Sequence, residues 1–234
     1  MKPLRESIFK ESIFNDVEDI VNNDTILIEQ FLKDNYHISG TYSIDGKNVV
    51  DVNGTMWLTN TDVESITNGL FRFGKVSGGF SCFLCHKLKS LKGAPEKVGG
   101  NFDCHDCKGL KTLEGAPKRV GGYFNCRECP KLTTLKGSPQ EVGGDFSCSS
   151  CRKLISLEGA PKKVGGGFYC CDCPNLKTLE GAPKEVGGDF SCMRCDSLKT
   201  LEGAPKELNG PIYAFGCDKL TITDQDREKY SIFE

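Results

Sequence analysis

The feature that most constrains this chain is a segment that repeats every 22 residues from about Val76 to Thr223, in six near-copies and a degenerate seventh. One copy runs from Val98 to Pro117 and reads Val-Gly-Gly-Asn-Phe-Asp-Cys-His-Asp-Cys-Lys-Gly-Leu-Lys-Thr-Leu-Glu-Gly-Ala-Pro. A unit this short cannot bury its own apolar side chains and must stack on its neighbours, so the period predicts a solenoid. We expect a mainly β fold of about seven stacked coils joined by a parallel sheet.

Spacing within one copy indicates which side chains face inward. Phe102 and Cys104 are two residues apart, so in a strand they point to the same side, and we assign that side to the core. Leu110 and Leu113 follow with three-residue spacing on the return side of the coil. Gly-Ala-Pro then turns the chain, and Val-Gly-Gly leads into the next strand.

The regions outside the repeats are expected to close the two ends of the solenoid. Residues 1–38 form a helical N-terminal segment, with one helix over Ile13–Val21 and a second that begins at Asp24 as N-cap. Residues 39–75 form a β-meander and a capping coil, with turns at Asp45-Gly46 and Asn53-Gly54 and with Leu58 in register with Phe80. Residues 76–223 form the solenoid, and residues 224–234 form a C-terminal cap or tail.

The run Phe-x-Cys-x-x-Cys-x-x-Leu-x-x-Leu resembles a leucine-rich repeat of the cysteine-containing subtype, in which Cys replaces the Asn that ends the strand. The run from Cys217 to Asp224 is similar to that subtype as well. Phe and Cys stand where Leu is usual, and a 22-residue unit leaves no room for a long convex helix. The array also resembles uncharacterised repeat proteins of gut bacteria and their bacteriophages, a likeness that implies no particular activity.

Fourteen cysteines invite three interpretations. The chain shows neither the apolar core of a signal peptide nor a membrane-length apolar stretch, so we expect a cytoplasmic protein with reduced thiols. We favour buried packing in two internal ladders, with equivalent cysteines about 5 Å apart. Zinc held between neighbouring coils and thiol-redox chemistry stay open as alternatives. The alternative metal ligands are the six Cys-x-x-Cys pairs: Cys82, Cys85, Cys104, Cys107, Cys126, Cys129, Cys148, Cys151, Cys170, Cys173, Cys192 and Cys195.

The outward strand positions differ most between copies, which indicates that the fold leaves them free. They form three expected rows on one exposed face, and Gly167, Ser191 and Cys171 belong to these rows. Exposed aromatic side chains, Met and Arg are typical of an interface core. The predicted partner-binding residues are Phe83, Asn101, Asp103, His105, Tyr123, Arg127, Asp145, Tyr169, Met193, Arg194, Tyr213 and Phe215.

The residue pattern shows no nucleophile–base pair, phosphate-cradling loop or carboxylate constellation, so we predict no enzyme activity and no cofactor. Our leading hypothesis is a protein–protein interaction module, in one version a phage factor that acts on a host or defence protein. The formal net charge of −2 disfavours a general nucleic-acid or membrane binder. Nucleic-acid or nucleotide binding along the return edge stays an alternative, through Lys87, Lys89, Lys92, Lys108, Lys111, Lys131, Lys136, Arg152, Lys153, Lys177, Lys199 and Lys219. The sequence does not fix the oligomeric state.

Overall fold

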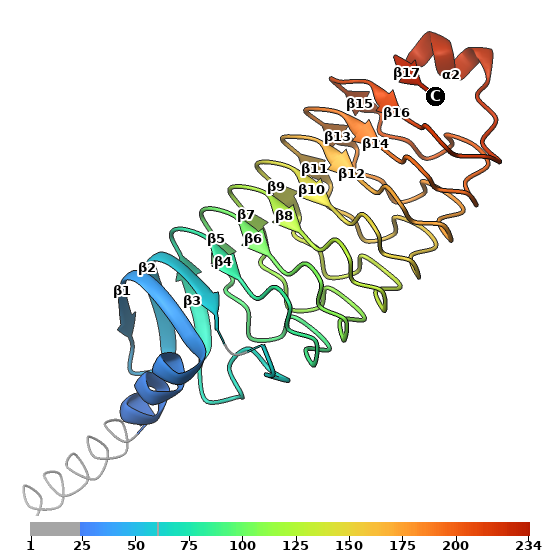
Figure 1. Cartoon of the computed structure of the whole chain (residues 1–234). Helices are drawn as coiled ribbons and strands as arrows, with labels where there is room; N and C mark the ends of the chain where they lie inside the picture. The colour runs from blue at the N-terminus through green and yellow to red at the C-terminus, as the bar shows by residue number, and fades with distance from the viewer. Residues whose placement is uncertain (1–23, 60) are drawn as a thin grey trace, which may run out of the picture.

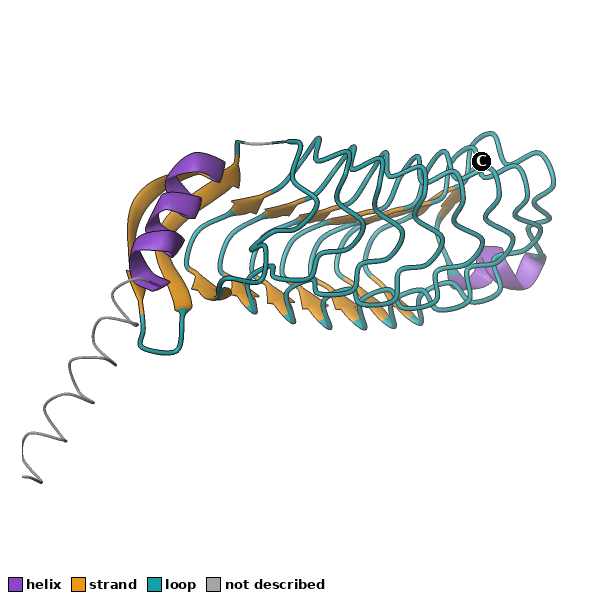
Figure 2. Cartoon of the chain, turned by 90° about the horizontal axis from the view of Figure 1, so that it is seen from below, coloured by secondary structure: helices purple, strands orange, loops and turns teal. Residues whose placement is uncertain are grey.

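The computed structural model describes residues 24–59 and 61–234. The chain winds into a solenoid of about eight turns, as the repeat period predicts, with short strands along its length and loops on the return side (Figures 1 and 2). Neighbouring turns pair in parallel and in register, so each side chain lies beside its equivalent one repeat away. The fold is therefore mainly β.

Each coil contributes two short strands to two parallel ladders. We call the first the Phe-strand ladder: β2 (Val49–Leu58), β4 (Phe80–Ser81), β6 (Phe102–Asp103), β8 (Phe124–Asn125), β10 (Phe146–Ser147), β12 (Phe168–Tyr169), β14 (Phe190–Ser191), β16 (Ile212–Tyr213) and β17 (Ile232–Phe233). The second is the Val-strand ladder: β3 (Arg72–Val76), β5 (Lys97–Val98), β7 (Arg119–Val120), β9 (Glu141–Val142), β11 (Lys163–Val164), β13 (Glu185–Val186) and β15 (Glu207–Leu208).

The Gly-Gly pair between the two strands of a coil allows the coils to approach closely. A Cβ atom on Gly121 would lie 2.1 Å from the carbonyl oxygen of Gly99 in the preceding coil. A second glycine serves the return side, where Gly115 has a φ of 91°, a left-handed conformation that side chains disfavour. Packing between coils thus explains why these glycines recur.

Columns of identical side chains fill the interior. The rings of Phe102 and Phe124 stack with centroids 5.0 Å apart and planes 5° apart, and the same arrangement continues to Phe190. The two leucines of each repeat are buried in parallel columns, and Leu110 and Leu113 have no exposed surface. The inward assignment of Phe, Cys and Leu is confirmed.

The N-terminal cap contains the helix of residues 24–35 and the antiparallel hairpin of β1 (Tyr36–Ile44) and β2. Ile28 and Leu32 are buried against the first coils, so this helix docks on the solenoid. The helix predicted over Ile13–Val21 lies outside the described residues.

Two details predicted for the cap are wrong. Asn53-Gly54 is not a turn but lies inside β2, where Gly54 pairs with Gly40 across the hairpin. The turn of the β1–β2 hairpin is at Asp45, whose Oδ1 accepts the N–H of Val49 at 2.8 Å. In addition, Met56 rather than Leu58 aligns with Phe80, because the first coil is two residues longer than the others.

The C-terminal residues close the other end with more structure than a tail. Helix α2 (Asp224–Lys229) begins with a capping box in which Thr223 and Asp226 exchange hydrogen bonds. The hydroxyl of Tyr230 then donates to the carbonyl oxygen of Pro205 at 2.9 Å, and β17 adds a last strand to the Phe-strand ladder.

Candidate functional site

The outward side chains of the Phe-strand ladder form a surface that we call the strand face. It contains a groove of about 610 Å³ near the N-terminal cap. The groove is lined by Thr55, Met56, Trp57, Gly78, Gly79, Phe80, Ser81, Phe83, Gly100, Asn101, Asp103, His105 and Tyr123. Its volume lies in the range of small-molecule sites.

Aromatic pairs and a few polar groups define this groove. Trp57 stacks on His37 with ring centroids 4.2 Å apart, and Phe83 stacks on His105 at 5.2 Å. The Nδ1 atom of His105 lies 2.8 Å from Asp103 Oδ1, which holds the imidazole in place. Ser81 Oγ is buried with no hydrogen-bond partner among the described residues.

A second hollow of about 210 Å³ lies farther along the strand face, between Tyr123 and Tyr169. The ring of Tyr169 leans over its own coil, since a Cβ atom on Gly167 would lie 2.4 Å from the Tyr169 hydroxyl oxygen. Asp145 stands beside the hollow, and its Oδ1 accepts the N–H of Gly167 at 2.8 Å. Tyr123 borders both hollows and separates them.

The strand face is acidic. Asp103, Asp145 and Asp189 occupy its rows, whereas Arg127 is the one arginine or lysine there. Arg127 is paired with Glu128 at 3.4 Å. Burial and the nearby carboxylates of Asp145 and Asp189 raise the pKa of Tyr169. Likewise, burial and then the charge of Asp103 raise the pKa of Tyr123. Both tyrosines therefore stay protonated next to negative charge.

Three positions assigned to the exposed rows are buried, and that part of the prediction is wrong. Gly167 is covered by the ring of Tyr169. Ser191 is 2% exposed, between the paired neighbours Tyr169 and Tyr213. Cys171 is 8% exposed, and its Sγ contacts Ser191 Oγ at 3.0 Å. Large tyrosine side chains cover the small residues beside them.

The other predicted partner residues differ in exposure and in whether they line a hollow. Tyr123, Asn101, Asp145, Arg127 and Phe215 are exposed. Those that are half-buried are Phe83, Asp103, His105, Tyr169, Met193 and Tyr213. The two hollows bring together most of the N-terminal members but leave out Met193, Tyr213 and Phe215.

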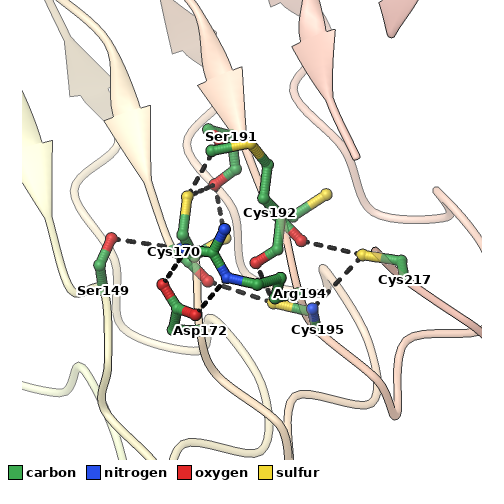
Figure 3. A network of polar contacts seen from close by, with 10 residues as sticks. Ser149, Cys170, Asp172, Ser191, Cys192, Arg194, Cys195 and Cys217 are labelled. Atoms are coloured by element: carbon green, nitrogen blue, oxygen red, sulfur yellow. Dashed lines mark hydrogen bonds and ion pairs between the residues drawn. The ribbon is translucent and has the colours of Figure 1, made fainter. Parts of the chain in front are cut away.

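Arg194 lies at the corner after the strand, where its φ of 53° is left-handed. Its guanidinium forms a bidentate ion pair with Asp172, at 2.5 and 2.6 Å (Figure 3). The pairing lowers the pKa of Asp172. Two of the guanidinium nitrogens of Arg194, Nε and one terminal NH2, are thus engaged within the chain.

Trp57 is the main lining residue that the sequence reasoning missed. It lies 24 residues before Ser81 in the pairing, not 22, and so falls outside a strict repeat alignment. The signal that identifies it is alignment of Met56-Trp57 with Phe80-Ser81, an apolar residue followed by an outward one.

The twelve cysteines of the Cys-x-x-Cys pairs form two buried columns, half-buried Cys217 extends one of them, and all fourteen cysteines are free thiols. From Cys107 onward, the second thiol of each coil donates to the carbonyl oxygen of the first cysteine of the preceding coil, whereas the thiol of Cys85 donates to Phe83 O at 3.7 Å. Cys107 Sγ lies 3.1 Å from Cys82 O, and Cys151 Sγ lies 3.3 Å from Cys126 O. The series ends at Cys217, which is 3.0 Å from Cys192 O (Figure 3). Each strand-ending carbonyl thereby gains a donor inside the core.

Burial is the main cause that raises the pKa of Cys104, Cys126 and Cys148, so these thiols stay protonated. Cys217 is half-buried at the end of the ladder. Hydrogen bonding with the Cys192 thiol and the Cys195 N–H lowers its pKa to about 7. In residues 24–59 and 61–234, no group of three or more His, Cys, Asp or Glu side chains is arranged to hold a metal ion.

Several lysines of the return edge are already paired with carboxylates. Lys92 lies 3.2 Å from Glu114, and Lys136 lies 3.0 Å from Glu158. Lys87 and Lys89 are similarly paired with acids of the capping coil. The edge therefore presents less free positive charge than its lysine count indicates.

These features define a repeat protein of the parallel β-solenoid class, with a thiol-lined core and an acidic, aromatic strand face. Comparison with known protein families, with curated proteins and with solved structures finds no match for this chain. Within the described ranges, no helix is both long and apolar enough to span a bilayer.

Proposed function

We propose that this protein is a non-enzymatic interaction module that binds a protein partner through the strand face. The observation that carries the proposal is the groove of about 610 Å³, walled by Trp57, Phe83 and Tyr123. Aromatic residues that surround a hollow with a few polar groups are typical of the anchor sites of protein interfaces. Solenoids present such extended surfaces for recognition.

The proposal includes a biological setting. The sequence resemblance to repeat proteins of gut bacteria and their phages supports a phage factor that acts on a host or defence protein in the bacterial cytoplasm. The leucine-rich-repeat resemblance supports the same recognition role. In that subtype Cys takes the place of a strand-ending Asn, and here Cys151 follows β10 after a turn.

Affinity capture with two matched variants tests the proposal. The first variant carries Tyr123→Ala, Tyr169→Ala and Tyr213→Ala on the strand face. The control carries Lys97→Ala, Arg119→Ala and Lys163→Ala on the Val-strand ladder, where all three side chains are exposed. We expect the control to retain the proteins captured by the unmodified chain and the tyrosine variant to lose them, with circular dichroism showing that both fold. Equal capture by all three proteins contradicts the proposal.

A further inference from the structure

We infer that the hollow between Tyr123 and Tyr169 is an arginine pocket, and that the partner presents an arginine side chain to it. The inference rests on the proposed function, because it names the chemistry of the segment that the strand face binds. The hollow of about 210 Å³ is below the range of about 300–1,000 Å³ typical of small-molecule and cofactor sites. It therefore suits a single side chain.

The walls and the charge of the hollow match a guanidinium. Tyr123 and Tyr169 offer aromatic surfaces, on which a planar guanidinium stacks. Asp145 lines the same hollow, and one of its oxygens is held by the N–H of Gly167. That bond fixes the carboxylate on a rigid strand end and leaves Oδ2 for an incoming donor. A fixed carboxylate beside aromatic rings selects a planar cation over a compact one.

The remaining charges near the hollow favour a cation as well. Burial, and after it the charges of Asp145 and Asp189, raise the pKa of the Tyr169 hydroxyl, so both carboxylates act at the wall of the hollow. Arg127 also lines the hollow and is the one opposing charge, but Glu128 pairs with it at 3.4 Å. Asn125 and Ser147 complete the polar lining, and neither carries a charge.

The test is a titration of the full-length protein with the peptide acetyl-Gly-Ser-Arg-Ser-Gly-amide, followed by NMR of the backbone amides. Two matched peptides replace the arginine with citrulline, which keeps the shape without the charge, or with lysine. We expect saturable shifts at Tyr123, Asp145 and Gly167 with the arginine peptide. Affinity should fall about tenfold for the citrulline peptide, since a charged hydrogen bond is lost. The lysine peptide should bind more weakly than the arginine peptide.

Three variants identify the pocket residues. Asp145→Asn retains an oxygen for the N–H of Gly167 while removing the charge, and we expect about tenfold weaker binding of the arginine peptide. Glu180→Gln makes the same charge change at an exposed return-side position and should leave binding unchanged. Arg127→Ala removes the like charge, so the same peptide should bind more tightly.

Absence of binding, equal binding of the arginine and citrulline peptides, or an unchanged affinity in Asp145→Asn each overturns the arginine pocket. These results are separable from those of the capture experiment. If no peptide binds but the tyrosine variant still loses its partners, the pocket is refuted and the proposed function stands. If the arginine peptide binds but the tyrosine variant keeps every partner, the proposed function is refuted instead.

Discussion

The thiol ladder makes a sharp prediction about two cysteines of one coil. Cys148 and Cys151 are both fully buried, but only the Cys151 thiol donates to a carbonyl oxygen, that of Cys126 at 3.3 Å. Cys151→Ala removes the thiol donor of that buried oxygen, and Cys148→Ala removes only a packed sulfur atom. The two substitutions are otherwise chemically identical.

The magnitudes follow from the two losses. A buried acceptor left unsatisfied costs about 1–3 kcal/mol. Removing one buried heavy atom costs about 1 kcal/mol, by analogy with a methylene group. We therefore expect Cys151→Ala to lower the free energy of unfolding by about 2–4 kcal/mol and Cys148→Ala by about 1 kcal/mol.

Guanidinium unfolding in reducing buffer measures the difference, with both variants and the unmodified protein followed by far-UV circular dichroism. Repeat proteins do not always unfold in one step. The quantity to compare is therefore the decrease in the free energy of the first unfolding transition. Equal destabilisation by the two variants would refute the hydrogen-bonding role of the second cysteine in each pair.

Three other predictions follow from the core and from the approach of the coils. Because burial raises thiol pKa values such as those of Cys126 and Cys148, the folded state holds these protons more tightly than the unfolded state. The contribution of these thiols to the free energy of unfolding should therefore be constant below the unfolded thiol pKa of about 8.5. Above it, the contribution should fall by up to about 1.4 kcal/mol per pH unit for each such thiol. Unfolding measured from pH 6 to pH 10 tests this, and a flat profile contradicts it. Half-buried Cys217, with its pKa of about 7, should react first with iodoacetamide at pH 7.5, as peptide mapping would show; uniform labelling of the folded protein contradicts that order. Gly121→Ala places a Cβ atom 2.1 Å from a backbone oxygen and should lower the free energy of unfolding by about 3 kcal/mol. In Gly46→Ala the new Cβ atom meets no atom within 4 Å, so the free energy of unfolding should change little. Similar melting temperatures for the two variants would argue against close contact between coils.

The repeat region could be predicted closely because every coil obeys the same constraint. Phe102, Cys104 and Leu110 recur at one spacing, and the stacking that buries them follows from that spacing. The two caps are harder to predict than the repeats, since no repeat constrains them. Asn53-Gly54 has the composition of a turn, yet tertiary pairing with β1 holds it within a strand.

The strand face shows the same limit for the site. Alternation correctly places Tyr123 and Asp145 outward, because the period of a strand is fixed by its geometry. Alternation cannot show that Tyr169 leans over Gly167, because the direction of a long side chain depends on its neighbours. It also cannot show that Trp57 joins the groove, because the first coil has its own length.

Site-specific photo-crosslinking tests the central claim most directly. Tyr123→p-benzoylphenylalanine places the reactive group between the two hollows, and Ile155→p-benzoylphenylalanine places it on the return side, where Ile155 is 55% exposed. Irradiation in the cell should yield a covalent adduct with one defined protein from position 123 and none from position 155. Adducts from position 155 alone, or the same adducts from both positions, would contradict recognition through the strand face.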